Sequence, residues 1–167
     1  MWTAAVAWVG ISDLAAWHET HKDGNYGEMI RQWVGAPGQS DAIDAELRAR
    51  SPITHLSNAR DVALEIAAGR HDGHKGSVPI SHSLRAFNEI AKANGVDAIS
   101  EGEIEQMSRP DGHLDAPTEG DRETDPAYGQ EIFLRRTAGN ARVTIFEGGH
   151  TGIATATMAW FAKHKPT

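Results

Sequence analysis

Cysteine is absent from the 167-residue chain, and its absence removes several classes of site at once. These residues can form no disulfide, no zinc–cysteine centre and no thiol nucleophile. The same absence leaves the redox compartment open, because the number of cysteines is the sequence feature that would distinguish an oxidising from a reducing environment.

The chain also lacks long apolar runs and clusters of basic residues. No stretch is long enough to span a bilayer, and the opening segment from Met1 to Val6 lacks the basic start of a signal peptide. The formal net charge is −7 at pH 7, so we expect the surface to repel nucleic acid and anionic membranes. The sequence therefore predicts neither nucleic acid nor membrane as a partner, and it leaves the localisation unknown.

Apolar residues are plentiful, at 40% of the chain, and the length suits one globular domain over residues 1–167. Two apolar runs, Ala4 to Val9 and Val62 to Ala67, predict strands. The first run is uninterrupted by polar residues, which is typical of a strand buried on both faces. Because it begins almost at residue 1, we expect further strands to precede it.

Helical patterns alternate with these strands. Apolar residues from Tyr26 to Val34 follow a helical period, and Ser40 is a candidate N-cap for a second helix. Pro79 suits the first turn of a third helix, and Ser100 with Glu103 forms a capping-box pattern that predicts a fourth.

The C-terminal third contains an irregular segment and then two more strands. Residues 109–128 are rich in Pro, Gly, Asp and Glu, so we interpret residues 96–130 as an inserted surface excursion. Ile132 to Arg136 and Arg142 to Phe146 predict strands, and a last helix follows residue 150. The alternation predicts an α/β fold with a mainly parallel sheet of about three to four strands.

Two loops after predicted strands contain the residues best suited to chemistry. Asp72 follows one strand and His150 follows another, and glycines flank both residues. Open α/β sheets place their sites at the carboxyl ends of strands. A serine hydrolase needs an imidazole to accept the serine proton and a carboxylate to orient that imidazole. Turn capping by Asp72 and helix initiation by His150 remain the alternatives without chemistry.

At these two loops the chain resembles a known family. Residues 69–79 read G-R-H-D-G-H-K-G-S-V-P and are similar to the acid loop of prolyl-oligopeptidase-like α/β-hydrolases. Residues 144–150 read T-I-F-E-G-G-H and, with the helix carrying A-W-F at 159–161, look like that family's histidine loop and closing helix. Residues 5–14, A-V-A-W-V-G-I-S-D-L, look like the strand and loop that follow the nucleophile segment.

The resemblance implies the C-terminal half of a peptidase S9-like serine hydrolase, with a partial α/β-hydrolase fold. Asp72 would be the triad acid and His150 the general base. The implied substrate is a peptide or an ester, and no cofactor is implied. The family's nucleophile lies in a G-x-S-x-G elbow, which this sequence lacks.

The nearest substitute for the elbow is the segment Gly10-Ile11-Ser12-Asp13-Leu14. Ser12 is a weak nucleophile candidate, because Leu14 stands where the tight turn needs a small residue. We therefore expect this chain alone to be inactive, with the nucleophile in a missing N-terminal half. Asp13 and Trp17, which follow the first strand, are weaker candidates for substrate binding.

Two other hypotheses remain open. The chain could be a non-catalytic binding or oligomerising module, in which Ala4 to Val9 forms a sheet edge that pairs with another copy; this predicts a homo-oligomer. Histidines at 18, 21, 71 and 74 could instead bind a metal with a neighbouring aspartate. Their spacing matches no tight ligand motif, so we predict no metal site.

Overall fold

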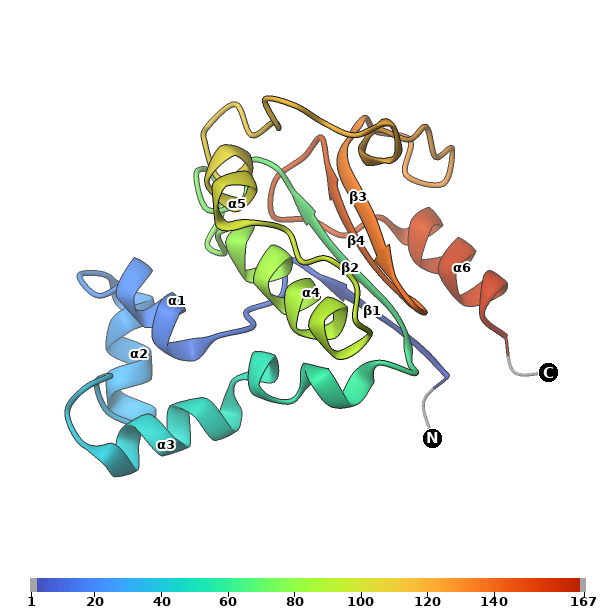
Figure 1. The fold of residues 1–167 in the computed structure, drawn as a ribbon. Coiled ribbons are helices and arrows are strands. Elements are labelled where there is room, and N and C mark those ends of the chain that lie inside the picture. Colours follow the sequence, from blue (N-terminus) through green and yellow to red (C-terminus); the bar gives the residue numbers. More distant parts are fainter. Residues whose placement is uncertain (1–2, 166–167) are drawn as a thin grey trace.

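The computed structural model describes residues 3–165 of the chain. One open four-stranded sheet lies between helices (Figure 1). Its strand order is β1–β2–β4–β3, and the strands are β1 (Ala4–Trp8), β2 (Ala63–Gly69), β3 (Ile132–Ala138) and β4 (Ala141–Phe146). β1, β2 and β4 run parallel, and β3 pairs antiparallel with β4. The predicted α/β fold with a mainly parallel sheet of three to four strands is confirmed.

Six α-helices complete the described part of the chain. They are α1 (Leu14–Thr20), α2 (Asn25–Trp33), α3 (Asp41–Arg50), α4 (Ser81–Ala93), α5 (Glu101–Met107) and α6 (Ala154–Lys163). Short 3-10 turns lie at Pro52–Thr54, Leu56–Ala59 and Glu119–Asp121. None of the helices in residues 3–165 has the length and apolar character needed to cross a membrane.

Local sequence signals start two of these helices where they were expected. Ser40 caps α3 by accepting a hydrogen bond from the backbone N–H of Ile43 at 3.3 Å. Ser100 and Glu103 form both bonds of a capping box at the start of α5. Both helix starts are confirmed, because the side chains that cap them are neighbours in sequence.

The two faces of the sheet are buried against different helices. On one face, Leu84, Phe87 and Ile90 of α4 pack on strand residues such as Ile66 and Ile145. Helix α6 covers the other face, where its buried Ala156 joins a smaller cluster around Phe146. Helices α1–α3 form a separate lobe with its own small core (Figure 1).

Strand β1 differs from its prediction as a strand buried on both faces. All five of its residues, Ala4–Trp8, are only half-buried. The reason is its position at the edge of the sheet, where among the described strands it pairs with β2 alone. Its apolar sequence is thus combined with a free hydrogen-bonding edge.

The predicted surface excursion is anchored more deeply than its composition indicates. Leu114, Asp121 and Tyr128 are each at most 3% exposed. The Tyr128 hydroxyl donates to the Glu65 carboxylate of β2 at 2.7 Å, and Asp121 accepts from Arg136 of β3 at 2.8 Å. The segment between α5 and β3 therefore follows the sheet and is pinned to it at several points.

Candidate active site

Asp72 and His150 lie side by side, although 78 residues separate them in sequence. The Nδ1 atom of His150 is 2.9 Å from the Oδ2 atom of Asp72. Since a carboxylate only accepts hydrogen bonds, the proton between them belongs to Nδ1, and in the neutral imidazole Nε2 is then left without one. This is the tautomer that a general-base histidine requires.

Adjacent parallel strands bring the pair together. Asp72 follows β2, His150 follows β4, and residues Ala68 and Gly69 of β2 pair in register with Ile145 and Phe146 of β4. Both loops therefore leave the sheet at its carboxyl edge, the usual location of sites in such sheets.

The Asp72 carboxylate is held rigidly. Its side chain is completely buried, and its Oδ1 atom accepts hydrogen bonds from the backbone N–H groups of Gly73 at 3.0 Å and Val78 at 3.2 Å. These two bonds leave Oδ2 directed at His150. The acid loop thus orients the carboxylate through its own backbone.

Two glycines allow the acid and histidine loops to approach so closely. A Cβ atom on Gly69 would overlap the backbone of Gly148, and one on Gly76 would overlap the carboxylate of Asp72 and lie 2.8 Å from the Cβ of His150. Any side chain at either position would have to displace the opposite loop. Gly76 in particular packs directly on the Asp72–His150 pair.

Ion pairs from Glu147 join the same two loops. Its carboxylate is 2.6 Å from Nε of Arg70 and 2.9 Å from Nε2 of His71, and the backbone N–H of His71 donates to the carbonyl of Gly148 at 3.0 Å. The Arg70 guanidinium also stacks 4.1 Å from the ring centroid of Phe133. The histidine loop is therefore clamped to the acid loop on the side next to β3.

The imidazole of His150 is accessible, with 45% of its side-chain surface exposed. Within residues 3–165, Asp72 is the hydrogen-bond partner of its ring, through Nδ1. An exposed imidazole held by a buried carboxylate can accept a proton from a group brought to its free nitrogen.

The structure places Ser12 next to a different histidine. Its hydroxyl donates to the carbonyl of His82 at 2.9 Å and lies 3.3 Å from Nδ1 of that ring, and Ser12 is 5% exposed. Ser12 is thus a buried residue engaged with His82, and its hydrogen bonds give the nucleophile prediction no support.

His82 has the opposite proton arrangement to His150. Its Nδ1 atom faces the backbone N–H groups of Ser12 and Asp13 at 3.3 and 3.4 Å, so this nitrogen accepts. Burial lowers the pKa of His82, although the carboxylate of Asp13 acts in the opposite direction. His82 is therefore a neutral structural histidine that holds the loop between β1 and α1.

The weaker candidates, Asp13 and Trp17, have structural contacts. Asp13 is the N-cap of α1 and accepts from the backbone N–H groups of Ala15 and Ala16. Trp17 is 8% exposed in the core of the α1–α3 lobe, and its indole N–H donates to the carbonyl of Ser77 at 3.0 Å. Trp17 thereby holds the backbone of the acid loop in place at Ser77. Its position in the sequence did not indicate this role.

The histidines considered for a metal have separate partners. His18 lies against Arg31, His21 against the carbonyl of Ser77, and His74 against that of Ser108. No group of three or more His, Asp or Glu side chains in residues 3–165 is arranged to hold a metal ion. The metal hypothesis has no cluster to support it in this part of the chain.

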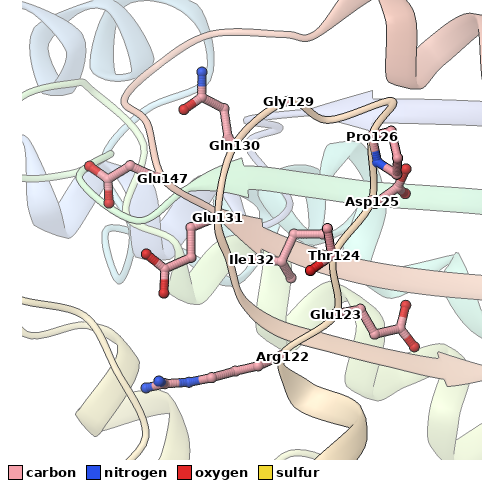
Figure 2. Close-up of a pocket in the computed structure, with 10 residues that line it drawn as sticks. All are labelled: Arg122, Glu123, Thr124, Asp125, Pro126, Gly129, Gln130, Glu131, Ile132 and Glu147. Carbon is pink, nitrogen blue, oxygen red and sulfur yellow. The ribbon is translucent and has the colours of Figure 1, made fainter.

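A large groove opens beside the histidine loop. It measures about 650 Å³ and is lined by the segment from Arg122 to Ile132 together with Glu147 (Figure 2). Since Glu147 follows β4 and Ile132 begins the antiparallel strand β3, the groove lies at the same carboxyl edge as the Asp72–His150 pair.

Comparisons of this chain with protein-family models, with curated proteins and with solved structures give no match. The resemblance to prolyl-oligopeptidase-like hydrolases therefore depends on the sequence segments at residues 5–14, 69–79 and 144–161 alone, and any function has to be argued from the geometry of the two loops.

Proposed function

We propose that Asp72 and His150 are the acid and base of a serine-hydrolase site that cleaves peptide or ester bonds, with a nucleophile from outside these 167 residues. The observation that carries the proposal is the 2.9 Å bond between a fully buried carboxylate and a half-exposed imidazole at the carboxyl edge of the sheet. Along the chain the acid precedes the histidine, and this is the order that α/β-hydrolases use.

The chemistry follows from the tautomer. Nε2 of His150 takes the proton of a serine hydroxyl as the serine oxygen attacks the carbonyl carbon of the substrate. The carboxylate of Asp72 then stabilises the imidazolium, which returns the proton to the leaving alcohol or amine. Water repeats the sequence on the acyl-enzyme and releases the acid. The groove beside Glu147 lies at the same edge, although neither Asp72 nor His150 lines it.

A direct test uses a fluorophosphonate probe, which reacts with activated serines. We expect no labelling of the isolated 167-residue chain. We expect labelling when this segment, tagged in its native host, is isolated with whatever polypeptide accompanies it. The His150→Ala variant should lose that labelling, while His74→Ala, an exposed histidine of the same acid loop, should retain it.

Two outcomes would contradict the proposal in different ways. Labelling of Ser12 in the isolated chain would show that the nucleophile lies within it. Equal labelling of the native-host sample with and without the His150 imidazole would show that His150 is not the base.

The second candidate function is assembly, and the edge strand β1 favours it. An apolar strand with an unpaired edge invites pairing with another chain. As an oligomerising module the chain would be a dimer or larger at micromolar concentration, and Asp72→Ala and His150→Ala would leave the assembly intact. A monomer by light scattering would argue against this candidate and leave the hydrolase proposal standing.

A further inference from the structure

One peptide group of the acid loop is hydrogen-bonded at both of its ends. Its N–H group, which belongs to Val78, donates to Oδ1 of Asp72 at 3.2 Å. Its carbonyl oxygen, which belongs to Ser77, is 3.0 Å from the indole Nε1 atom of Trp17 and 2.6 Å from the Nε2 atom of His21. A single planar peptide therefore lies between the buried carboxylate and two side chains of the α1–α3 lobe.

The lobe donates both hydrogen bonds to the Ser77 carbonyl. A carbonyl oxygen only accepts and has two lone pairs, so the Trp17 indole N–H and a protonated Nε2 of His21 occupy both of them. Trp17 lies in α1, and His21 is the C-cap of that helix four residues further on, a spacing that places both side chains on one face. Their rings pack edge to face with centroids 5.3 Å apart, and the ring of Tyr26 in α2 lies against both. The packing thus holds two donors toward one acceptor.

The bond from Val78 ties Asp72 to a different part of its loop. Oδ1 of Asp72 also accepts from Gly73, but Gly73 is the next residue in the chain and moves with Asp72. Val78 is six residues away and 3% exposed. A peptide carbonyl that accepts two hydrogen bonds is polarised, and its own N–H group then becomes a stronger donor. The lobe can therefore influence both the position and the strength of this bond to the carboxylate.

We propose that Trp17 and His21 are positioning residues for Asp72, the acid of the proposed hydrolase site. The lobe donates to the carbonyl end of the Ser77–Val78 peptide, the other end of that peptide donates to Oδ1, and the ring of His150 donates to Oδ2. The catalytic meaning of this inference rests on the proposed function, whereas the hydrogen bonds themselves need no nucleophile. The α1–α3 lobe thereby takes part in a site whose acid and base both lie on loops of the sheet.

The test removes one donor at a time in the isolated chain and measures hydrogen exchange of the Val78 amide. Trp17→Phe and His21→Phe each keep an aromatic ring and delete the N–H group. We expect the Val78 amide to exchange about ten-fold faster in either variant, relative to the Ile145 amide of the interior strand β4, as for one hydrogen bond of ordinary net strength. The low-field Nδ1 proton resonance of His150 should broaden as well, because the carboxylate that accepts it is held less firmly.

The chain offers a matched control for each variant. Trp160→Phe matches Trp17→Phe, because Trp160 is similarly buried and its indole N–H also donates to a backbone carbonyl, at 3.1 Å. His55→Phe matches His21→Phe, because Nε2 of His55 also lies 2.9 Å from a backbone carbonyl. Both controls should leave the Val78 exchange ratio and the low-field resonance unchanged. If Trp17→Phe does not fold, His21→Phe decides the result, because His21 is only half-buried.

The outcomes separate this inference from the proposed function. An unchanged exchange ratio in the Trp17 and His21 variants, or an equal rise in Trp160→Phe, would overturn the inference and leave the hydrolase proposal standing. A rise as expected, combined with no fluorophosphonate labelling of the native-host sample, would remove the hydrolase proposal and support the hydrogen-bonded link to Asp72. Where that sample is labelled, both variants should slow the labelling, and labelling at the parent rate would overturn the positioning role.

Discussion

Strand β2 positions two buried carboxylates that differ in where their hydrogen bonds lead. Glu65, within the strand, and Asp72, just beyond its end, are each 2% exposed. Asp72 accepts from two backbone N–H groups and from the half-exposed ring of His150. Glu65 accepts from the side chains of Tyr128, Thr144 and Arg142.

The difference separates a candidate reactive group from a structural one. Burial and the negative charge of Glu65 raise the pKa of Tyr128, so its hydroxyl keeps the proton that it donates. Tyr128, Thr144 and the Nε of Arg142 all donate to this one carboxylate, and such networks rigidify a core. At Asp72 one partner reaches solvent and can exchange a proton. A buried carboxylate is therefore a candidate for catalysis only when one of its hydrogen-bond partners is exposed to solvent.

The largest effect that we predict concerns Asp72 in the assembled hydrolase. Asp72→Asn keeps an acceptor for the backbone N–H groups but no longer favours a proton on Nδ1 of His150, so Nε2 would carry it instead. In the best-studied serine protease the equivalent change lowers kcat about 10⁴-fold, and we expect a loss of that order here in steady-state hydrolysis. Asp23→Asn, on the exposed surface, should leave kcat unchanged. Full activity of Asp72→Asn would remove the distinction between the two carboxylates.

The corresponding change at Glu65 should affect stability instead. Glu65→Ala leaves Arg142 and Tyr128 without their buried partner, and breaking such an arrangement costs about 3–5 kcal/mol of unfolding free energy. Urea denaturation measures it, with Glu105→Ala on exposed α5 surface as the control, expected within about 0.5 kcal/mol of the parent. A loss under 1 kcal/mol at Glu65 would show that the network contributes little.

Gly76 links stability to the proposed chemistry. Gly76→Ala forces a methyl group against Asp72 and His150, and overpacking of this kind costs about 1–3 kcal/mol. The low-field Nδ1 proton resonance of His150 should weaken or disappear with it. Gly149→Ala is the matched control, because a Cβ there meets nothing within 4 Å. Equal behaviour of the two variants would mean that the acid loop adapts to an added methyl group.

The smallest effect concerns His82, the buried counterpart of His150. Since its pKa is lowered on folding, the unfolded chain binds more protons below about pH 6.5, the ordinary histidine value. His82 thus contributes stability that is present above that pH and is lost as the pH falls through its lowered folded pKa. Thermal unfolding in a pH series should show this decline. His82→Asn, whose amide oxygen accepts without titrating, should flatten it; an unchanged slope would assign the decline to other groups.

Several features of this protein could be predicted from the sequence, and they are the local ones. The cap at Ser40, the capping box at Ser100 and the strand–helix alternation all depend on residues a few positions apart. The α/β class follows from that alternation. Even Asp72 and His150 could be selected singly, because each follows a predicted strand within a glycine-rich loop.

Contacts between distant segments were decided only by the tertiary structure. The 2.9 Å bond between Asp72 and His150 requires β2 and β4 to be neighbours in the sheet. Strand β3, which lies between them in sequence, is therefore placed at the edge of the sheet. The same strand order puts β1 at an edge, and folding brings Ser12 to His82 and not to His150. Glu65 was a visible signal, a single carboxylate in an apolar strand, but its partners come from two distant places in the chain, Tyr128 before β3 and Arg142 with Thr144 on β4. Local sequence patterns do not determine which distant residues come into contact, because the order of strands in the sheet depends on the packing of the whole chain.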